Sequence, residues 1–101
     1  MDASAETDRK FEATAYYVYR ASDGTILLSH TFVRPEGAPH NEAAIERDLL
    51  AEASRRARIA QEELAILTRD AAHPVDGTIL RVDPRARQLV ISHERFPRAR
   101  G

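Results

Sequence analysis

Two histidines at matching positions are the residues of this chain best suited to chemistry. His30 ends the pentapeptide ILLSH, and His93 ends the similar pentapeptide LVISH. Imidazoles bind metal ions and titrate near neutral pH, so two that converge can hold a metal or an anionic ligand. We therefore treat His30 and His93 as a candidate ligand or metal site. The simpler interpretation is that both are half-buried, hydrogen-bonded residues at the edge of a sheet.

The serines that precede these histidines do not form nucleophile and base pairs with them. Successive side chains of a strand point to opposite faces, so Ser29 cannot reach His30, and Ser92 cannot reach His93. The chain has no cysteine, no glycine-rich phosphate loop and no HExxH motif, which removes thiol chemistry, nucleotide-driven reactions and a common zinc site. We therefore favour a protein that is not an enzyme and needs no cofactor.

Five arginines in the second half of the chain form a candidate site for a polyanion, here called the arginine edge: Arg85, Arg87, Arg95, Arg98 and Arg100. Several clustered cations are what a phosphate backbone requires. The chain as a whole has a net charge of only −1, however, and a solvated tail explains the same residues. We therefore keep nucleic acid as an alternative partner, but we expect that the protein does not bind it.

A β-hairpin is predicted to position His30. Residues 11–20 alternate as a strand does, and the stretch ASDG at 21–24 supplies a turn before 25–33 alternates again. The odd positions of the first strand, which we assign to the core face, are Phe11, Ala13, Ala15, Tyr17 and Tyr19. On the second strand, His30 shares the core face with Ile26, Leu28 and Phe32.

A helix is predicted after the proline-containing loop at 34–40. Asn41 is the expected N-cap, and acids come early and arginines late, the order that a helix dipole favours. The stripe that should face the sheet consists of Ile45, Leu49, Ala53, Ala57 and Ala60. Two interpretations of 61–69 stay open, a continued helix or a break followed by a short strand at 64–68. We favour the strand, because a single helix of that length would overhang strands of normal length.

A second hairpin is predicted to carry His93. Residues 78–83 and 88–94 flank the turn DPRAR. The pentapeptide DGTIL occurs at 23–27, where it closes a hairpin, and at 76–80, where it opens one. The flanking residues of the two copies do not match. We therefore interpret the repeat as one turn sequence used twice, because Asp-Gly readily supplies a positive φ before a strand.

Length and composition indicate a single domain. The 101 residues are 43% hydrophobic and 31% charged, as in an ordinary soluble domain rather than a disordered chain. We predict a leader at 1–10, one α+β domain at 11–96 and a basic, frayed tail at 97–101. The predicted architecture is an antiparallel sheet of two β-hairpins with one helix packed on one face, ββαββ, or ββαβββ if the short strand forms.

One helix covers only one face of a sheet, so the other face should stay half apolar and open. We assign to this candidate interface Tyr16, Val18, Leu27, Val33, Ile79 and Val90. A small domain with such a face, or with an unpaired edge strand, gains stability by self-association. The favoured function is therefore a non-enzymatic protein-interaction or regulatory module that forms a homodimer. The alternatives are a small-molecule or metal-binding protein that uses His30 and His93, and a nucleic-acid-binding protein that uses the arginine edge.

The sequence also predicts where the protein works. No apolar run approaches the roughly 20 residues that span a bilayer. The first ten residues carry three acids and no apolar segment, so they do not resemble a secretory signal. We therefore expect a cytoplasmic protein without a membrane partner.

Overall fold

The computed structural model describes residues 11–71 and 75–93. Its elements in chain order are β1 (Phe11–Arg20), β2 (Ile26–Pro35), α2 (Glu42–Ala57), the short 3₁₀ helix η1 (Gln61–Glu63), β3 (Leu64–Asp70), β4 (Thr78–Asp83) and β5 (Gln88–Ser92). The leader predicted at 1–10 and the tail predicted at 97–101 lie outside the described residues. Among the residues that are described, no helix is both long and apolar enough to cross a membrane.

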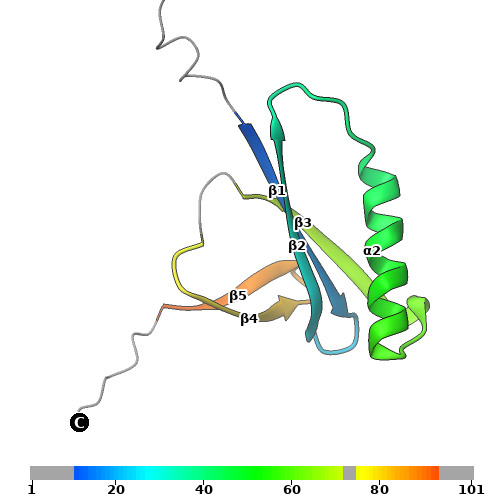
Figure 1. The fold of residues 1–101 in the computed structure, drawn as a ribbon. Coiled ribbons are helices and arrows are strands. Elements are labelled where there is room, and N and C mark those ends of the chain that lie inside the picture. The colour runs from blue at the N-terminus through cyan, green and yellow to red at the C-terminus, as the bar shows by residue number, and fades with distance from the viewer. Residues whose placement is uncertain (1–10, 72–74, 94–101) are drawn as a thin grey trace, which may run out of the picture.

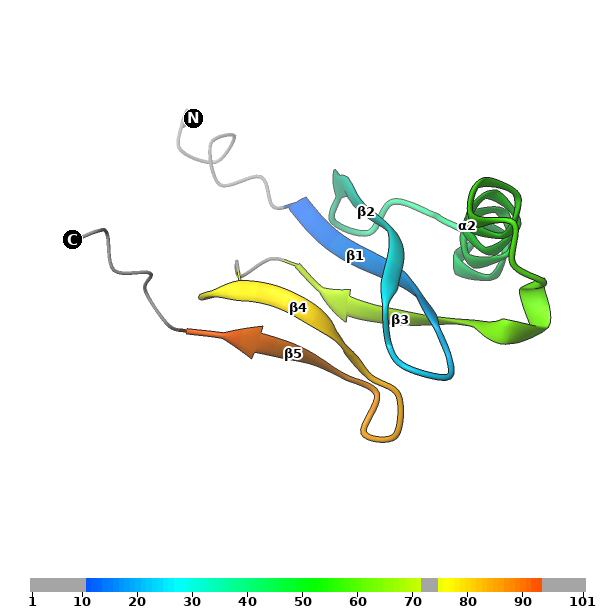
Figure 2. The same cartoon turned by 90° about the horizontal axis from the view of Figure 1, so that it is seen from below.

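The described elements form three layers. Strands β2, β1 and β3 form an antiparallel sheet in that order, and β4 pairs with β5 in a second sheet. Figures 1 and 2 show α2 on one side of the three-stranded sheet and the β4–β5 hairpin on the other. The predicted α+β class is confirmed, with the additional strand present as β3. The structure adds that the two hairpins belong to separate sheets.

Local capping defines both ends of α2. The Asn41 side chain accepts a hydrogen bond from the Ala44 amide at 3.0 Å, as expected of the predicted N-cap. At the other end Arg58 takes a left-handed conformation with a φ of 59°, and the Ser54 hydroxyl donates to the Ile59 carbonyl at 2.6 Å. The helix therefore stops before β3 begins, and the favoured strand interpretation is confirmed.

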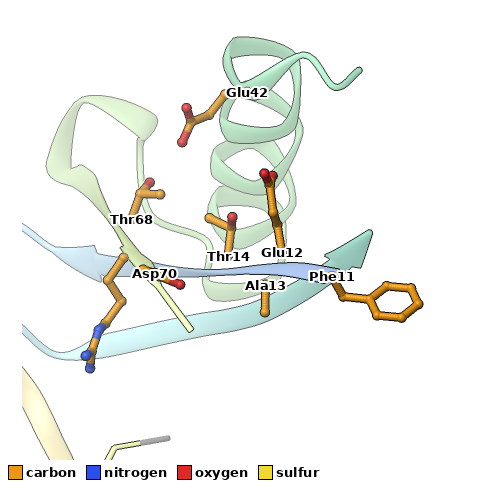
Figure 3. A pocket seen from close by; sticks show the side chains of 8 residues that line it. Phe11, Glu12, Ala13, Thr14, Glu42, Thr68 and Asp70 are labelled. Carbon is orange, nitrogen blue, oxygen red and sulfur yellow. The ribbon is translucent and has the colours of Figure 1, made fainter. Parts of the chain in front are cut away.

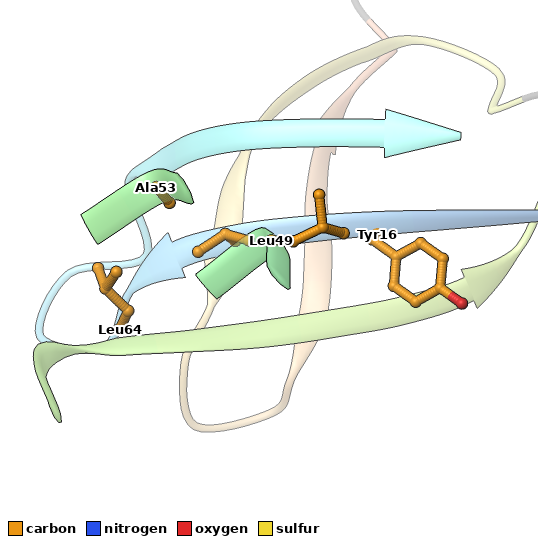
Figure 4. Packing of buried hydrophobic residues seen from close by; sticks show 5 residues of the cluster. Tyr16, Leu49, Ala53 and Leu64 are labelled. Atoms are coloured by element: carbon orange, nitrogen blue, oxygen red, sulfur yellow. The ribbon is translucent and has the colours of Figure 1, made fainter. Parts of the chain in front are cut away.

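The main core lies between α2 and the three-stranded sheet. Leu49 and Ala53 of α2 pack with Tyr16 and Val18 of β1 and with Leu64 of β3 (Figure 4). All five side chains are at most 8% exposed. The small side chain of Ala53 on the inner face of the helix leaves room for α2 to lie close to the sheet beside the larger tyrosine.

The even-numbered residues of β1 face the helix, which corrects the predicted orientation of this strand. Tyr16 and Val18 are 0% exposed beneath α2, whereas the prediction placed them on the open face. The odd-numbered Ala15 and Tyr19 point to the other side and are also buried, at 3% and 1% exposed. Because β1 is the central strand and residues 15–19 are covered on both faces, buried apolar side chains occur there at both odd and even positions. Hydrophobic alternation cannot distinguish the faces of such a strand.

The β4–β5 hairpin covers the second face of the sheet. The Val82 amide donates to the Gly24 carbonyl at 2.9 Å, and Val82 is 0% exposed. Arg87 donates to the Tyr19 hydroxyl at 3.5 Å and to the Ile66 carbonyl at 3.1 Å. Ala15, Tyr19 and Val82 are therefore buried on the face that was predicted to be open.

Candidate functional site

The structure does not bring His30 and His93 together. His30 is exposed on β2, where it pairs with Tyr16 and so lies on the helix side of the sheet. Its ring lies against Phe32, with ring centroids 4.4 Å apart. His93 follows β5, in the hairpin on the other side of the sheet (Figure 2). In the described part of the chain, no group of three or more His, Cys, Asp or Glu side chains is placed to hold a metal ion.

The six residues predicted to line one open face are spread over several environments. Tyr16, Val18 and Leu27 belong to or pack against the helix-side core, Ile79 lines the space under the hairpin, and Val33 and Val90 lie on β2 and β5. The prediction of one shared open face is therefore corrected, because the hairpin covers the face opposite the helix. Val33 keeps a large exposed surface, at 65%, and it lies on an outer strand of the sheet.

The predicted arginine edge lies only partly within the described residues. Arg95, Arg98 and Arg100 lie outside them. Arg85 is exposed in the turn between β4 and β5. Arg87 follows in the same turn, and its guanidinium donates to groups on β1 and β3. Arg87 therefore helps to hold the hairpin on the sheet.

Replacing Arg87 by methionine is expected to loosen the hairpin, whereas the same change at Arg85 is not. Methionine has a Cβ just as arginine does, so the substitution at Arg87 leaves the backbone strain of its positive φ, 55°, unchanged. Losing the donors to Tyr19 and Ile66 should lower the free energy of unfolding by about 1 kcal/mol, against less than about 0.5 kcal/mol for the exposed Arg85. Urea denaturation of the two variants measures the difference. Equal losses would contradict the assigned contact.

A polar groove opens between the first turn of α2, the start of β1 and the end of β3 (Figure 3). Its volume is about 510 Å³. The polar residues that line it are Glu12, Thr14, Glu42, Thr68, Arg69 and Asp70. The antiparallel register brings them together, since Thr14 pairs with Asp70 and Tyr16 with Thr68.

Sequence reasoning missed the polar groove. Glu12 and Thr14 share the even parity of Tyr16, which the prediction assigned to the face away from the helix. Glu42 was interpreted only as a favourable charge at a helix N-terminus. The alternation of polar and apolar residues in β1 was the available signal, but it does not say which residues of β3 lie opposite.

An ion-paired network beside the polar groove is centred on Arg34. One Arg34 nitrogen, Nη2, lies 3.1 Å from Glu12 Oε1 and 3.3 Å from His40 Nε2. The other, Nη1, donates to the Thr14 hydroxyl at 3.5 Å. The Arg34 side chain is only 16% exposed, so solvent screens this pair less than an open surface pair. The network holds Glu12 in place and balances its charge.

The Tyr16 hydroxyl is buried beside the groove and has no hydrogen-bond partner in the described structure. Its ring packs edge-on against Phe32, with centroids 5.6 Å apart. Burial raises the pKa of Tyr16 above the ordinary 10.0; the Glu42 and Glu46 carboxylates raise this pKa as well, while Arg34 lowers it. The hydroxyl therefore stays protonated at neutral pH, close to two carboxylates.

Stability is expected to fall as the pH rises above about 10 because of Tyr16. An unfolded chain releases this proton near pH 10.0, whereas the folded protein retains it to higher pH. This group therefore causes no loss of stability below pH 10.0, and stability is lost as the pH rises from there through the raised pKa. Tyr16→Phe should remove this component of the pH dependence. Urea denaturation of both proteins at a series of alkaline pH values measures how the free energy of unfolding changes with pH. The same pH dependence for Tyr16→Phe and the wild type would contradict the assignment.

Comparison with known proteins identifies no relative that could assign a role to these residues. The candidate sites rest on the positions, burial and charges of the residues themselves. No family model matches the chain, and searches of curated proteins and of solved structures also gave no match.

Proposed function

We propose that the chain is a non-enzymatic interaction module that forms a homodimer through its outer strand β2. In this arrangement the β2 strands of two copies pair antiparallel around a twofold axis and join their three-stranded sheets into one continuous sheet. The proposal keeps the cytoplasmic location predicted from the sequence, since a chain without cysteine does not depend on an oxidising compartment.

The exposed edge of β2 is the observation that carries the proposal. The sheet order is β2-β1-β3, so β2 is an outer strand over its ten residues. An outer strand presents unpaired backbone groups, which proteins commonly protect with charged side chains or proline. Residues 26–33 of β2 contain no Asp, Glu, Lys, Arg or Pro. This stretch therefore lacks the usual protection against pairing with another strand.

The opposite edge of the sheet, strand β3, carries charged side chains and has a backbone group that is already paired. Strand β3 carries the charged residues Arg69 and Asp70. In addition, the Arg87 guanidinium from the hairpin donates to the Ile66 carbonyl of β3 at 3.1 Å. One backbone acceptor of β3 is thus already engaged within the chain. The contrast favours β2 as the strand that pairs with a partner.

A second copy of the chain is the partner that fits this edge best. Antiparallel pairing of β2 with itself is self-complementary, as a twofold interface requires. The described residues bury few apolar side chains, and Phe11 and Val33 remain 55% and 65% exposed near one end of β2. Burial of exposed apolar side chains in a dimer interface stabilises a small domain with a small core more than it stabilises a large domain.

Sedimentation velocity over a range of concentrations tests the proposal. At high concentration the wild-type chain should approach twice its mass of 11.3 kDa. Val33→Lys should stay at the monomer mass or dissociate at least about tenfold more readily, because a lysine on facing edge strands introduces repulsion worth at least about 1.4 kcal/mol. Leu80→Lys is the matched control, since Leu80 is a similarly exposed apolar residue, at 58%, on the hairpin.

The two variants separate an effect on β2 from a general effect of charge. Leu80→Lys should dimerise like the wild type, and circular dichroism should report the same fold for both variants. A wild-type chain that remains monomeric at the highest concentration would overturn the proposal. Equal weakening of the dimer by Val33→Lys and Leu80→Lys would overturn the role of β2.

A further inference from the structure

We propose that the polar groove binds the ammonium group of a small organic amine, with the Glu42 carboxylate as its main partner. Of the residues that the structure describes, three carboxylates line the groove, from Glu12, Glu42 and Asp70, against one guanidinium, that of Arg69. The volume of about 510 Å³ falls in the range of small-molecule sites, roughly 300–1,000 Å³. The inference is independent of the proposed dimer, because the groove is built by α2, β1 and β3.

Glu42 is the carboxylate best placed to accept an ammonium group. Glu12 is already paired with Arg34 at 3.1 Å, and Glu46 accepts a hydrogen bond from Thr68 at 3.3 Å. Glu42 takes part in none of the ion pairs found among the described residues, and its side chain reaches from the helix over the sheet (Figure 3). Hydrogen bonds to a charged group are stronger than neutral ones, so this carboxylate can dominate recognition.

The unpartnered Tyr16 hydroxyl is an independent observation that points to a ligand here. Tyr16 is 0% exposed, and its hydroxyl has no partner in the described structure. The residues beside it, Thr14 on the same strand and Thr68 across from it, both line the groove. Figure 4 shows the ring extending over β3 with the hydroxyl directed toward the C-terminal end of that strand. A buried polar group left unpaired is costly, so a ligand donor that pairs with it is favoured.

A ligand reaches this hydroxyl only after a side-chain rotation in the groove wall. The Tyr16 oxygen has almost no exposed surface in the described arrangement. Glu42 is an exposed residue in the first turn of α2. The ammonium group therefore meets the exposed Glu42 carboxylate first, and a second N–H pairs with the hydroxyl after this movement.

The charges select an organic cation over other ligands. A phosphate or carboxylate ligand would be repelled by the carboxylates of the groove. A metal ion needs several ligands at short distance, and in the residues that the structure describes no group of three or more His, Cys, Asp or Glu is arranged to supply them. An ammonium group needs only hydrogen-bond acceptors, which Glu42 and the threonine hydroxyls provide.

Isothermal titration of the full chain with putrescine tests the inference, with the neutral diol of the same chain length as the control ligand. Putrescine should bind and raise the melting temperature, and the diol should do neither. Glu42→Gln should weaken putrescine binding at least about tenfold, since it removes a charge-assisted hydrogen bond. Glu62→Gln, in the exposed 3₁₀ helix, is the matched control and should bind as the wild type does.

Tyr16→Phe gives a second readout that does not depend on charge. Without ligand, this variant should be at least as stable as the wild type, because it loses only an unpaired hydroxyl. It should nevertheless bind putrescine more weakly. The inference is overturned if putrescine and the diol act alike, if Glu42→Gln and Glu62→Gln bind alike, or if Tyr16→Phe binds with unchanged affinity.

Discussion

Replacement of Gly24 by alanine is expected to detach the β4–β5 hairpin from the sheet. A Cβ built on Gly24 would overlap the carbonyl oxygen of Val82, and both are fixed by the hydrogen bond between their backbones. Gly24 also has a φ of 81°, where alanine is strained. The neighbouring group is backbone and cannot rotate away. We expect the free energy of unfolding to fall by about 3 kcal/mol or more, which is among the largest single-residue effects.

Gly37→Ala separates the two causes of this loss. Gly37 has nearly the same φ, 83°, but a Cβ there would meet no atom within 4 Å. The substitution should therefore cost only the backbone strain, about 1 kcal/mol. The difference between the two variants in urea denaturation measures the close approach of the hairpin. Equal losses would mean that the hairpin does not rest on the β1–β2 turn.

Leu49→Ala is expected to lower the free energy of unfolding by about 2–5 kcal/mol, because it leaves a cavity at the centre of the helix-side core. Leu49 is 7% exposed and packs with Tyr16 and Val18. Small domains are stable by only about 5–15 kcal/mol in total, so this variant should be substantially unfolded in mild denaturant.

Leu50→Ala is the control for the Leu49 prediction. Leu50 is the next residue on α2 and is only partly buried against the same core. Its truncation should cost clearly less, since less apolar surface is removed from the core. Thermal unfolding of both variants, followed by circular dichroism, gives the comparison. A larger loss at Leu50 would show that α2 packs on the sheet through a different face.

Local signals made α2 and the turns predictable from the sequence. The Asn41 side chain caps the helix as expected, and the hydrogen bond to Ala44 explains why the helix begins there. The two copies of DGTIL each place a glycine at positive φ, 81° at Gly24 and 127° at Gly77. Each glycine also lies against backbone of the hairpin, Val82 for the first and Ser92 for the second. The repeat is therefore turn chemistry in two different places.

Features that depend on long-range packing were not predictable in the same way. Buried apolar residues lie on both faces of β1 between 15 and 19, because α2 covers one face and the hairpin covers the other, so the parity of the strand was assigned in reverse. The polar groove depends on the register of β1 and β3, which places Thr14 opposite Asp70. His30 and His93 end similar pentapeptides, but the hairpins that carry them lie in separate sheets. The similarity of the two pentapeptides therefore did not indicate that the two imidazoles lie close together.

Single-cysteine cross-linking along β2 tests the proposed homodimer most directly, because the chain has no cysteine of its own. Two cysteines form a disulfide only when their Cα atoms lie within about 7 Å. In a twofold antiparallel pair, the residue nearest the axis meets its own copy. The yield of covalent dimer should therefore peak at one of Ser29→Cys, Thr31→Cys and Val33→Cys, while Leu80→Cys stays at background. Background yields along the whole of β2 would contradict a homodimer formed through this strand.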